Sequence, residues 1–181
     1  MSSSHTLTLW VASHDGRSAQ IAERMATYFE AHGLATCTHA LTDAPPPVPA
    51  GPVLVVAAVR YGHLLPGARA ALRHLNQARH GPLALAVVCL SARRPDRRSA
   101  RDNPYLRHAI ARHGVTPILA EAFGGRLDYA RCRWLDRQMI RLIMKLTGGP
   151  SDGVATLDCT DWAQVEHFAA RLTAMLATDT H

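Results

Sequence analysis

The sequence lacks the features that mark membrane, secreted and metal-binding proteins. No apolar run approaches the roughly 18 residues of a membrane-spanning helix, and Val53–Val59 is far shorter. The four cysteines are widely spaced, with no C-x-x-C and no histidine at ligand spacing, which excludes a disulfide framework or zinc site. The first residues lack the basic and apolar regions of a signal peptide. We therefore expect a cytoplasmic protein without bound metal, whose thiols are mostly buried and inert.

Acidic residues are fewer than basic ones, and the net charge is +6. A GC-rich genome also favours arginine over lysine, but it does not explain where the charge lies. Residues 91–112 carry seven arginines against two aspartates, and residues 126–149 carry five arginines and Lys145 against two aspartates. Such local positive charge points to an anionic partner: a membrane surface, nucleic acid or a polycarboxylate substrate. Aromatic residues make up 6%, and no nucleic-acid motif is present, which disfavours nucleic acid.

Short apolar runs alternate with segments of helical periodicity. The runs predict strands at Thr6–Ala12, Ala35–His39, Val53–Val59, Leu83–Leu90 and Pro117–Phe123, with a weaker sixth at Val154–Cys159. Apolar stripes at Ile21–Phe29 and Ala68–Leu75 predict helices, and Asp161 with Gln164 predicts a capping box for the last helix. The alternation predicts an α/β fold, a doubly wound five-stranded parallel sheet in a single domain spanning residues 1–181.

Ligands of such sheets bind at the carboxyl ends of the strands, where the first loop is Ser13-His14-Asp15-Gly16-Arg17-Ser18. Hydroxyls and a glycine directly before a helix describe a phosphate cradle, although an ordinary polar turn with a cap has the same composition. Neither G-x-x-x-x-G-K-[ST] nor G-x-G-x-x-G is present, which disfavours nucleoside triphosphates and dinucleotides. Asp15 opposes an anion unless its carboxylate points away or Arg17 offsets it.

Two further loops follow buried strands. Val59-Arg60-Tyr61-Gly62-His63 suits a flat ring stacked on Tyr61, with close backbone approach at Gly62; the alternative is an ordinary turn with a packed tyrosine. Ser91-Ala92-Arg93-Arg94-Pro95-Asp96-Arg97-Arg98 is strongly basic, and the alternative there is a merely solvated loop. We expect all three loops at one edge of the sheet, and that convergence is more informative than any single loop.

Residues 126–149 contain a basic amphipathic pattern. Basic residues spaced four apart form one helical stripe, with leucines, isoleucines and methionines opposite, and Gly148-Gly149-Pro150 ends the helix. Three interpretations remain open. The helix packs on the domain, lies on anionic lipid, or forms a wall of the substrate site where arginines meet carboxylates.

These segments together resemble the menaquinone-dependent protoporphyrinogen IX dehydrogenase family, whose fold is flavodoxin-like. The residues that carry the resemblance are Asp15-Gly16, Arg60-Tyr61-Gly62-His63, Ala92-Arg93-Arg94-Pro95, the segment from Tyr129 through Trp134, Asp136 and Met139 to Gly149, and Thr160-Asp161-Trp162. The likeness extends from about residue 6 to residue 175. The segment 129–149 is its most specific part. One departure is Ala12, which stands where flavodoxin-like phosphate loops usually carry a hydroxyl.

The resemblance implies that FMN oxidises protoporphyrinogen IX to protoporphyrin IX, with menaquinone or a related quinone as acceptor. The implied FMN-binding residues are Ser13, His14, Asp15, Gly16, Arg17, Ser18, Val59, Arg60, Tyr61, Gly62, His63, Ser91, Ala92 and Arg93. His63 and Arg60 would be catalytic, His63 by moving pyrrole protons, unless it merely hydrogen-bonds its loop. The candidates for the substrate propionates are Arg93, Arg94, Arg97, Arg131 and Arg133.

The resemblance also implies a basic helical insertion at about 125–150, near the last strand. Through residues 131–146 the protein would lie peripherally on the cytoplasmic face of the inner membrane, and an oligomer is compatible with the sequence. Two alternative functions share the fold: a flavodoxin-type electron carrier and an NAD(P)H-dependent quinone reductase. Carriers are typically acidic around the flavin, whereas two segments at the expected flavin edge are basic here.

Overall fold

The computed structural model describes residues 6–42, 44–127 and 157–178, which build a parallel sheet between two helical layers. The parallel strands are β1 (Leu7–Ala12), β2 (Thr36–Ala40), β3 (Val53–Arg60), β5 (Leu83–Cys89) and β6 (Leu119–Gly124), in the order β2-β1-β3-β5-β6. The predicted five-stranded parallel sheet is therefore confirmed. A further strand of two residues, β4 (His63–Leu64), pairs antiparallel with the end of β3. The strand order reverses between β1 and β3, the position at which doubly wound sheets bind ligands.

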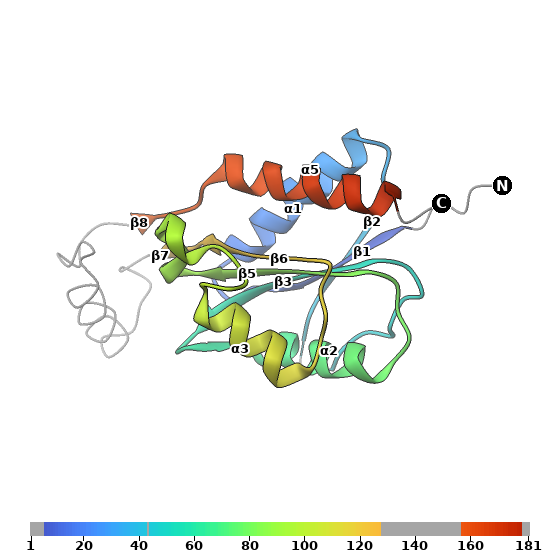
Figure 1. Ribbon diagram of the computed structural model, residues 1–181, viewed down its shortest axis with the longest axis horizontal. Helices are drawn as coiled ribbons and strands as arrows, with labels where there is room; N and C mark the ends of the chain where they lie inside the picture. Colours follow the sequence, from blue (N-terminus) through green and yellow to red (C-terminus); the bar gives the residue numbers. More distant parts are fainter. Residues whose placement is uncertain (1–5, 43, 128–156, 179–181) are drawn as a thin grey trace.

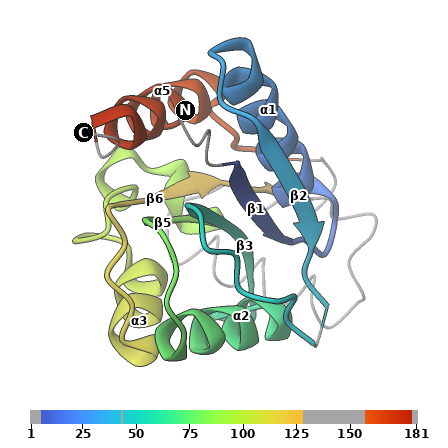
Figure 2. The same cartoon turned by 90° about the vertical axis from the view of Figure 1, so that its right-hand side faces the viewer.

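Helices cover both faces of the sheet. Helices α1 (Arg17–Ala31) and α5 (Trp162–Thr178) lie on one face, and α2 (Pro66–Gln77) and α3 (Pro104–His113) lie on the other (Figures 1 and 2). Alternate residues of each strand serve opposite layers, so that Leu9 packs with α1 and α5 whereas Trp10 packs on the α2/α3 side. Strand β5 is buried along its whole length, as its continuous apolar run predicts.

The helix starts agree only partly with expectation. The amide of Gln164 donates to Asp161 Oδ1 at 3.2 Å, which confirms the cap of α5. The other half of the predicted capping box is wrong. Instead of returning to Asp161, Gln164 Nε2 donates to Glu121 Oε1 at 2.7 Å and to the carbonyl of Ala122 at 3.0 Å, both in β6. A tertiary contact with the sheet replaces the local one.

The chain leaves the main sheet after β6. A separate antiparallel pair is formed by β7 (Arg126–Leu127) and β8 (Leu157–Asp158). The predicted strand Val154–Cys159 is thus reduced, within the described residues, to Leu157–Asp158, and it does not join the main sheet. The predicted basic helix, with Arg131 and Arg133, lies outside the described residues.

Other sequence expectations concern thiols, metals and membrane spans. Cys89 is buried, whereas Cys37 is exposed because it lies on the edge strand β2. Over residues 6–42, 44–127 and 157–178, no helix combines the length and apolar character needed to cross a membrane. The same ranges contain no group of three or more metal-ligating side chains placed to share an ion.

Candidate functional site

Three loops meet at the carboxyl edge of the sheet. They follow β1, β3 and β5, which are neighbours in the sheet. The first two loops are joined directly, because Arg60 Nη1 lies 3.1 Å from His14 Nδ1. The predicted cofactor residues at 13–18, 59–63 and 91–93 therefore all lie at this edge, as does the Arg94–Arg97 segment.

The first loop turns sharply at Gly16, whose φ of 89° lies in the left-handed region. The Gly16 amide donates to Ser13 Oγ at 3.1 Å, which fixes the turn, and no side chain caps α1 at this residue. Directly behind it, Ser18 is 1% exposed, and its Oγ has no hydrogen-bond partner in the described parts of the chain. A buried hydroxyl without a partner costs about 1–3 kcal/mol. Open space at Gly16 beside the start of α1 and an unsatisfied hydroxyl fit a phosphate group, which accepts hydrogen bonds from hydroxyls and from helix amides.

The side chains of Asp15 and Arg17 do not form an ion pair with each other. The Arg17 amide donates to Asp15 Oδ1 at 3.2 Å, so the carboxylate stays within the loop. The Arg17 side chain, 7% exposed, instead places Nη2 2.6 Å from Asp158 Oδ2 in β8 and its Cζ 5.5 Å from the Trp162 ring centroid. Arg17 therefore anchors the first loop to β8 and α5.

Asp158 is a residue of the site that the sequence did not indicate, because it is 141 positions away from Arg17. Burial acts to raise the pKa of its carboxyl. Hydrogen bonds from Thr160 and the positive charges of Arg17 and Arg126 outweigh that effect and hold the pKa below its ordinary value. Asp158 therefore remains ionised beside Arg17 at neutral pH.

The second loop is a two-residue hairpin turn between β3 and β4. Tyr61 and Gly62 have φ of 50° and 80°, the pair of left-handed residues that a type I′ turn requires. This conformation is uncommon for a tyrosine, and among the described residues Tyr61 is the only large hydrophobic side chain that is exposed, at 56%. Arg60 lies over its ring at 4.9 Å and donates to its hydroxyl at 3.1 Å. An oriented, exposed aromatic ring at this edge suits stacking on a flat ligand.

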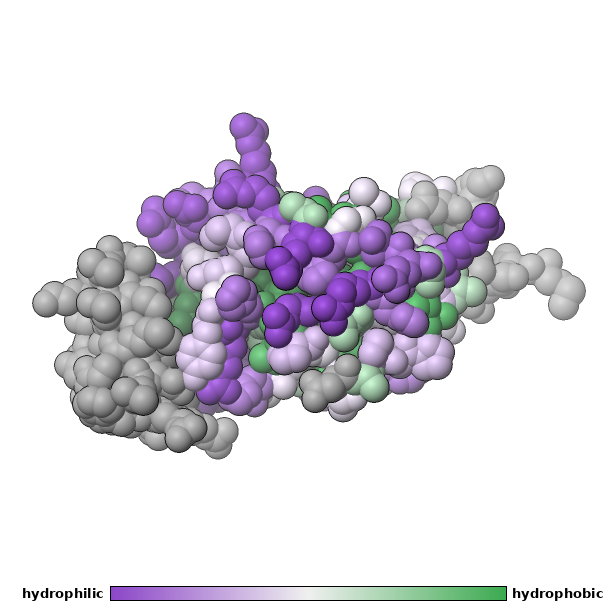
Figure 3. Space-filling model, turned by 90° about the horizontal axis from the view of Figure 1, so that it is seen from below, coloured by the Kyte–Doolittle hydropathy of each residue, from purple (hydrophilic) through white to green (hydrophobic). Residues whose placement is uncertain are grey.

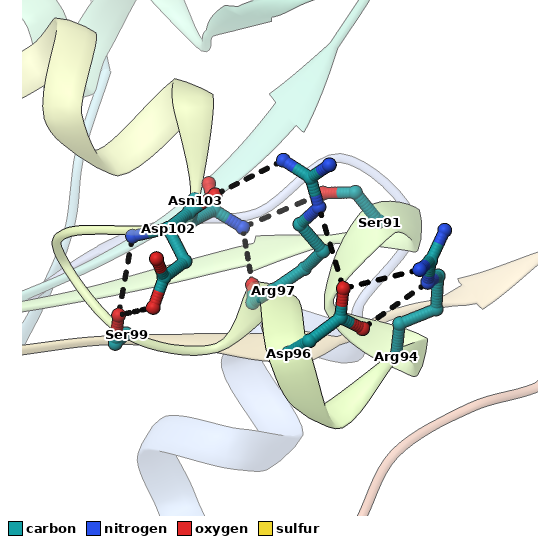
Figure 4. Close-up of polar contacts among 7 residues, drawn as sticks. All are labelled: Ser91, Arg94, Asp96, Arg97, Ser99, Asp102 and Asn103. Carbon is teal, nitrogen blue, oxygen red and sulfur yellow. Dashed lines mark hydrogen bonds and ion pairs between the residues drawn. The ribbon is translucent and has the colours of Figure 1, made fainter.

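The third loop consists of two short 3-10 helices, η1 (Leu90–Arg93) and η2 (Pro95–Arg97). Asn103, fully buried, holds it from the start of α3 by donating to the carbonyl of Arg97 at 2.8 Å (Figure 4). Arg94 donates to both oxygens of Asp96 at 3.1 Å, and Arg97 Nε lies 3.8 Å from the same carboxylate. Two of the five arginines predicted for substrate propionates, Arg94 and Arg97, thus already share one acidic partner. A substrate carboxylate there would compete with Asp96.

Comparisons with known proteins agree with this geometry. A flavodoxin domain matches residues 8–153. The protoporphyrinogen IX dehydrogenase (quinone) of Escherichia coli K12 is 36% identical over 121 residues, which cover 66% of this chain and 67% of that protein. The enzyme of the same name from Leishmania major is 36% identical over 124 residues, 68% of this chain and 54% of that one. Flavodoxin 1 from Bacillus cereus superposes with a TM-score of 0.54 at 12% identity, covering 93% of this chain and 97% of that one.

The fold defines a flavodoxin-like protein, and its three edge loops form a candidate ligand site at the carboxyl ends of β1, β3 and β5. Within that class, the chain belongs to the protoporphyrinogen IX dehydrogenase family and is a flavin-dependent oxidoreductase. The flavodoxin-like fold, the family and the enzyme class predicted from the sequence are therefore confirmed.

Proposed function

We propose that this chain uses FMN to oxidise protoporphyrinogen IX to protoporphyrin IX and transfers the electrons to a quinone such as menaquinone. Two observations together support this proposal. Three loops converge at one edge of the sheet, and the chain is 36% identical to a protoporphyrinogen IX dehydrogenase (quinone). Conversion of the substrate releases six electrons and six protons. Three quinones, each accepting two electrons and two protons, balance the reaction.

The first loop would hold the FMN phosphate. When bound, FMN supplies the two-electron chemistry that links the porphyrinogen to the quinone. The phosphate would lie at the start of α1, where the Ser18 hydroxyl has no hydrogen-bond partner among the described residues and Gly16 leaves open space. The flat ring would lie beside Tyr61, and Arg60 orients that tyrosine through the hydrogen bond to its hydroxyl.

His63 is the candidate for proton movement at the substrate. It is exposed, follows Gly62 directly and pairs with Arg60 across the hairpin. A histidine can take up and release protons near neutral pH, which suits the removal of pyrrole and bridge protons. Arg93, Arg94 and Arg97 of the third loop remain candidates for the propionates, as do Arg131 and Arg133. Residues 131–146 would touch the membrane that holds the quinone.

The test combines flavin identification with anaerobic turnover. Flavin is released from the purified protein by heat and compared with FMN and FAD standards by chromatography. We expect it to elute as FMN. Flavin-loaded protein is then mixed with protoporphyrinogen IX, and porphyrin fluorescence is followed with and without menaquinone. We expect fluorescence that grows only with quinone. Bound flavin without porphyrin formation would contradict the proposal and favour the electron carrier or the NAD(P)H-dependent quinone reductase.

A further inference from the structure

A pocket begins directly beside the second loop. Its volume is about 240 Å³, and it lies between the β3–β4 turn, α2 and α3. The side chains that give it its chemistry are His63, Arg69, Tyr105, His108, Arg112 and His113. Within the described parts of the chain, no acidic residue lines it. The pocket therefore has the character of an anion site.

The surrounding sequence explains why this positive charge has no acidic neighbour among the described residues. No aspartate or glutamate occurs in residues 44–95 or in residues 103–120, which include all of α2 and α3. Arg69 and Arg112 accordingly form no ion pair with any described residue. On the opposite layer, by contrast, Arg24 is paired with Glu166. Figure 3 looks onto the α2/α3 side and shows strongly hydrophilic side chains across it.

The electrostatics of His113 agree with an excess of positive charge. This residue is 6% exposed, and burial lowers the pKa of its imidazole. The charges of Arg73, Arg112, His108 and Arg69 lower that pKa further, and no carboxylate acts in the opposite direction. A bound anion would offset this local field.

The position of the pocket connects it to the flavin site. Tyr105 Cε1 lies 4.0 Å from the point where a Cβ would stand on Gly62, so the turn and α3 are in close approach. From Tyr105 to Arg112 the pocket follows α3 for about 10 Å, at 1.5 Å per residue. A ligand seated beside Tyr61 could therefore extend a flexible arm between α2 and α3.

We propose that this pocket is a carboxylate subsite that receives a propionate arm of the tetrapyrrole substrate, with Arg69 and Arg112 as its principal ligands. The assignment rests on the proposed function. Planar guanidinium groups bind both oxygens of a carboxylate. Arg69 and Arg112 need not leave an acidic partner to do so, whereas Arg94 and Arg97 share Asp96.

The test uses the double variant Arg69→Gln/Arg112→Gln in flavin-loaded protein. We expect affinity for protoporphyrin IX to fall about tenfold or more, as loss of charge-assisted hydrogen bonds implies. Affinity for the neutral dimethyl ester and flavin content should change less than about twofold. The matched control is Arg79→Gln/Arg107→Gln, which removes two exposed arginines on or next to the same helices that neither line the pocket nor act on His113. It should leave porphyrin affinity nearly unchanged.

Several outcomes overturn the subsite. If the two double variants lose the same affinity for protoporphyrin IX, the effect comes from general surface charge. If the Arg69/Arg112 variant loses the same affinity for protoporphyrin IX and for its dimethyl ester, the pocket does not recognise a carboxylate. Reduced binding to phosphatidylglycerol vesicles with unchanged porphyrin affinity would assign the pocket to a lipid phosphate instead. If the wild type oxidises the substrate and the Arg69/Arg112 variant keeps its KM, the subsite fails and the proposed function stands. If the wild type binds the acid through these arginines but forms no porphyrin, the function fails and the subsite stands.

Discussion

The ion pair between Arg17 and Asp158 should stabilise the protein more than a surface pair of the same length. Arg17 Nη2 lies 2.6 Å from Asp158 Oδ2, and the two side chains are 7% and 45% exposed. Removal of one partner from a fully buried pair costs about 3–5 kcal/mol, and a hydrogen bond to a charged group contributes about 1.5–3 kcal/mol. Because Asp158 is almost half-exposed, water screens the pair. We therefore expect a coupling energy of about 2 kcal/mol.

A double-mutant cycle with Arg17→Gln and Asp158→Ala measures this coupling. Asp158 Oδ1 also accepts a hydrogen bond from the Thr160 amide at 3.0 Å, and Asp158→Ala removes this bond too. The cycle is needed because the cost of losing this bond is the same with and without Arg17 and therefore cancels. Urea unfolding gives the free energies. A single variant that loses about 2 kcal/mol should also melt roughly 4–8 °C lower, for a chain of this size.

The matched control is the pair formed by Arg24 and Glu166, which joins α1 to α5, whereas Arg17 and Asp158 join α1 to β8. Its N–O distance is 2.5 Å, but the side chains are 55% and 43% exposed. Exposed pairs contribute about 0.2–1 kcal/mol, so its cycle should give a clearly smaller coupling. Equal couplings in the two cycles, or less than about 0.5 kcal/mol for Arg17 and Asp158, would refute the reasoning from burial.

Three further perturbations address the phosphate loop and the α2/α3 side. Gly16→Glu should abolish flavin retention, because φ of 89° disfavours any side chain and the carboxylate repels phosphate; yellow purified protein would refute the loop assignment. Asp15→Asn keeps an acceptor for the Arg17 amide but removes a negative charge, so titration with FMN should show roughly fivefold tighter binding, from about 1 kcal/mol of repulsion. His113 has a folded-state pKa below its ordinary 6.5, chiefly through burial, so the free energy of unfolding should fall as pH decreases below that value. His113→Asn should flatten this part of the pH profile in urea unfolding, and an unchanged profile would contradict it.

The sheet and its ligand edge were predictable because they follow from local sequence. Continuous apolar runs such as Leu83–Leu90 favour strands buried on both faces, and such strands typically run parallel between helices. Parallel strands place their carboxyl ends at one edge, which brought together the loops that begin at Ser13, Val59 and Ser91.

Elements that depend on tertiary contacts were not predictable in the same way. Helix α3 buries only Leu106, Ala109 and His113 and therefore has a weak apolar stripe; the Asn103-Pro104 start was its available signal. The Arg17–Asp158 pair joins residues 141 positions apart, and no spacing rule reaches that far. The pocket between α2 and α3 likewise depends on how two helices pack. The sequence does show that the segments forming this pocket have no acidic residues.

Electron transfer from a porphyrinogen to a quinone on this chain is measured through the anaerobic stoichiometry of the two products. Flavin-loaded protein is mixed with protoporphyrinogen IX and excess menaquinone, and porphyrin and quinol are quantified together over time. We expect three quinols for each porphyrin, because six electrons leave the substrate in pairs. Quinol formation without porphyrin, or porphyrin formed at the same rate without quinone, would contradict it.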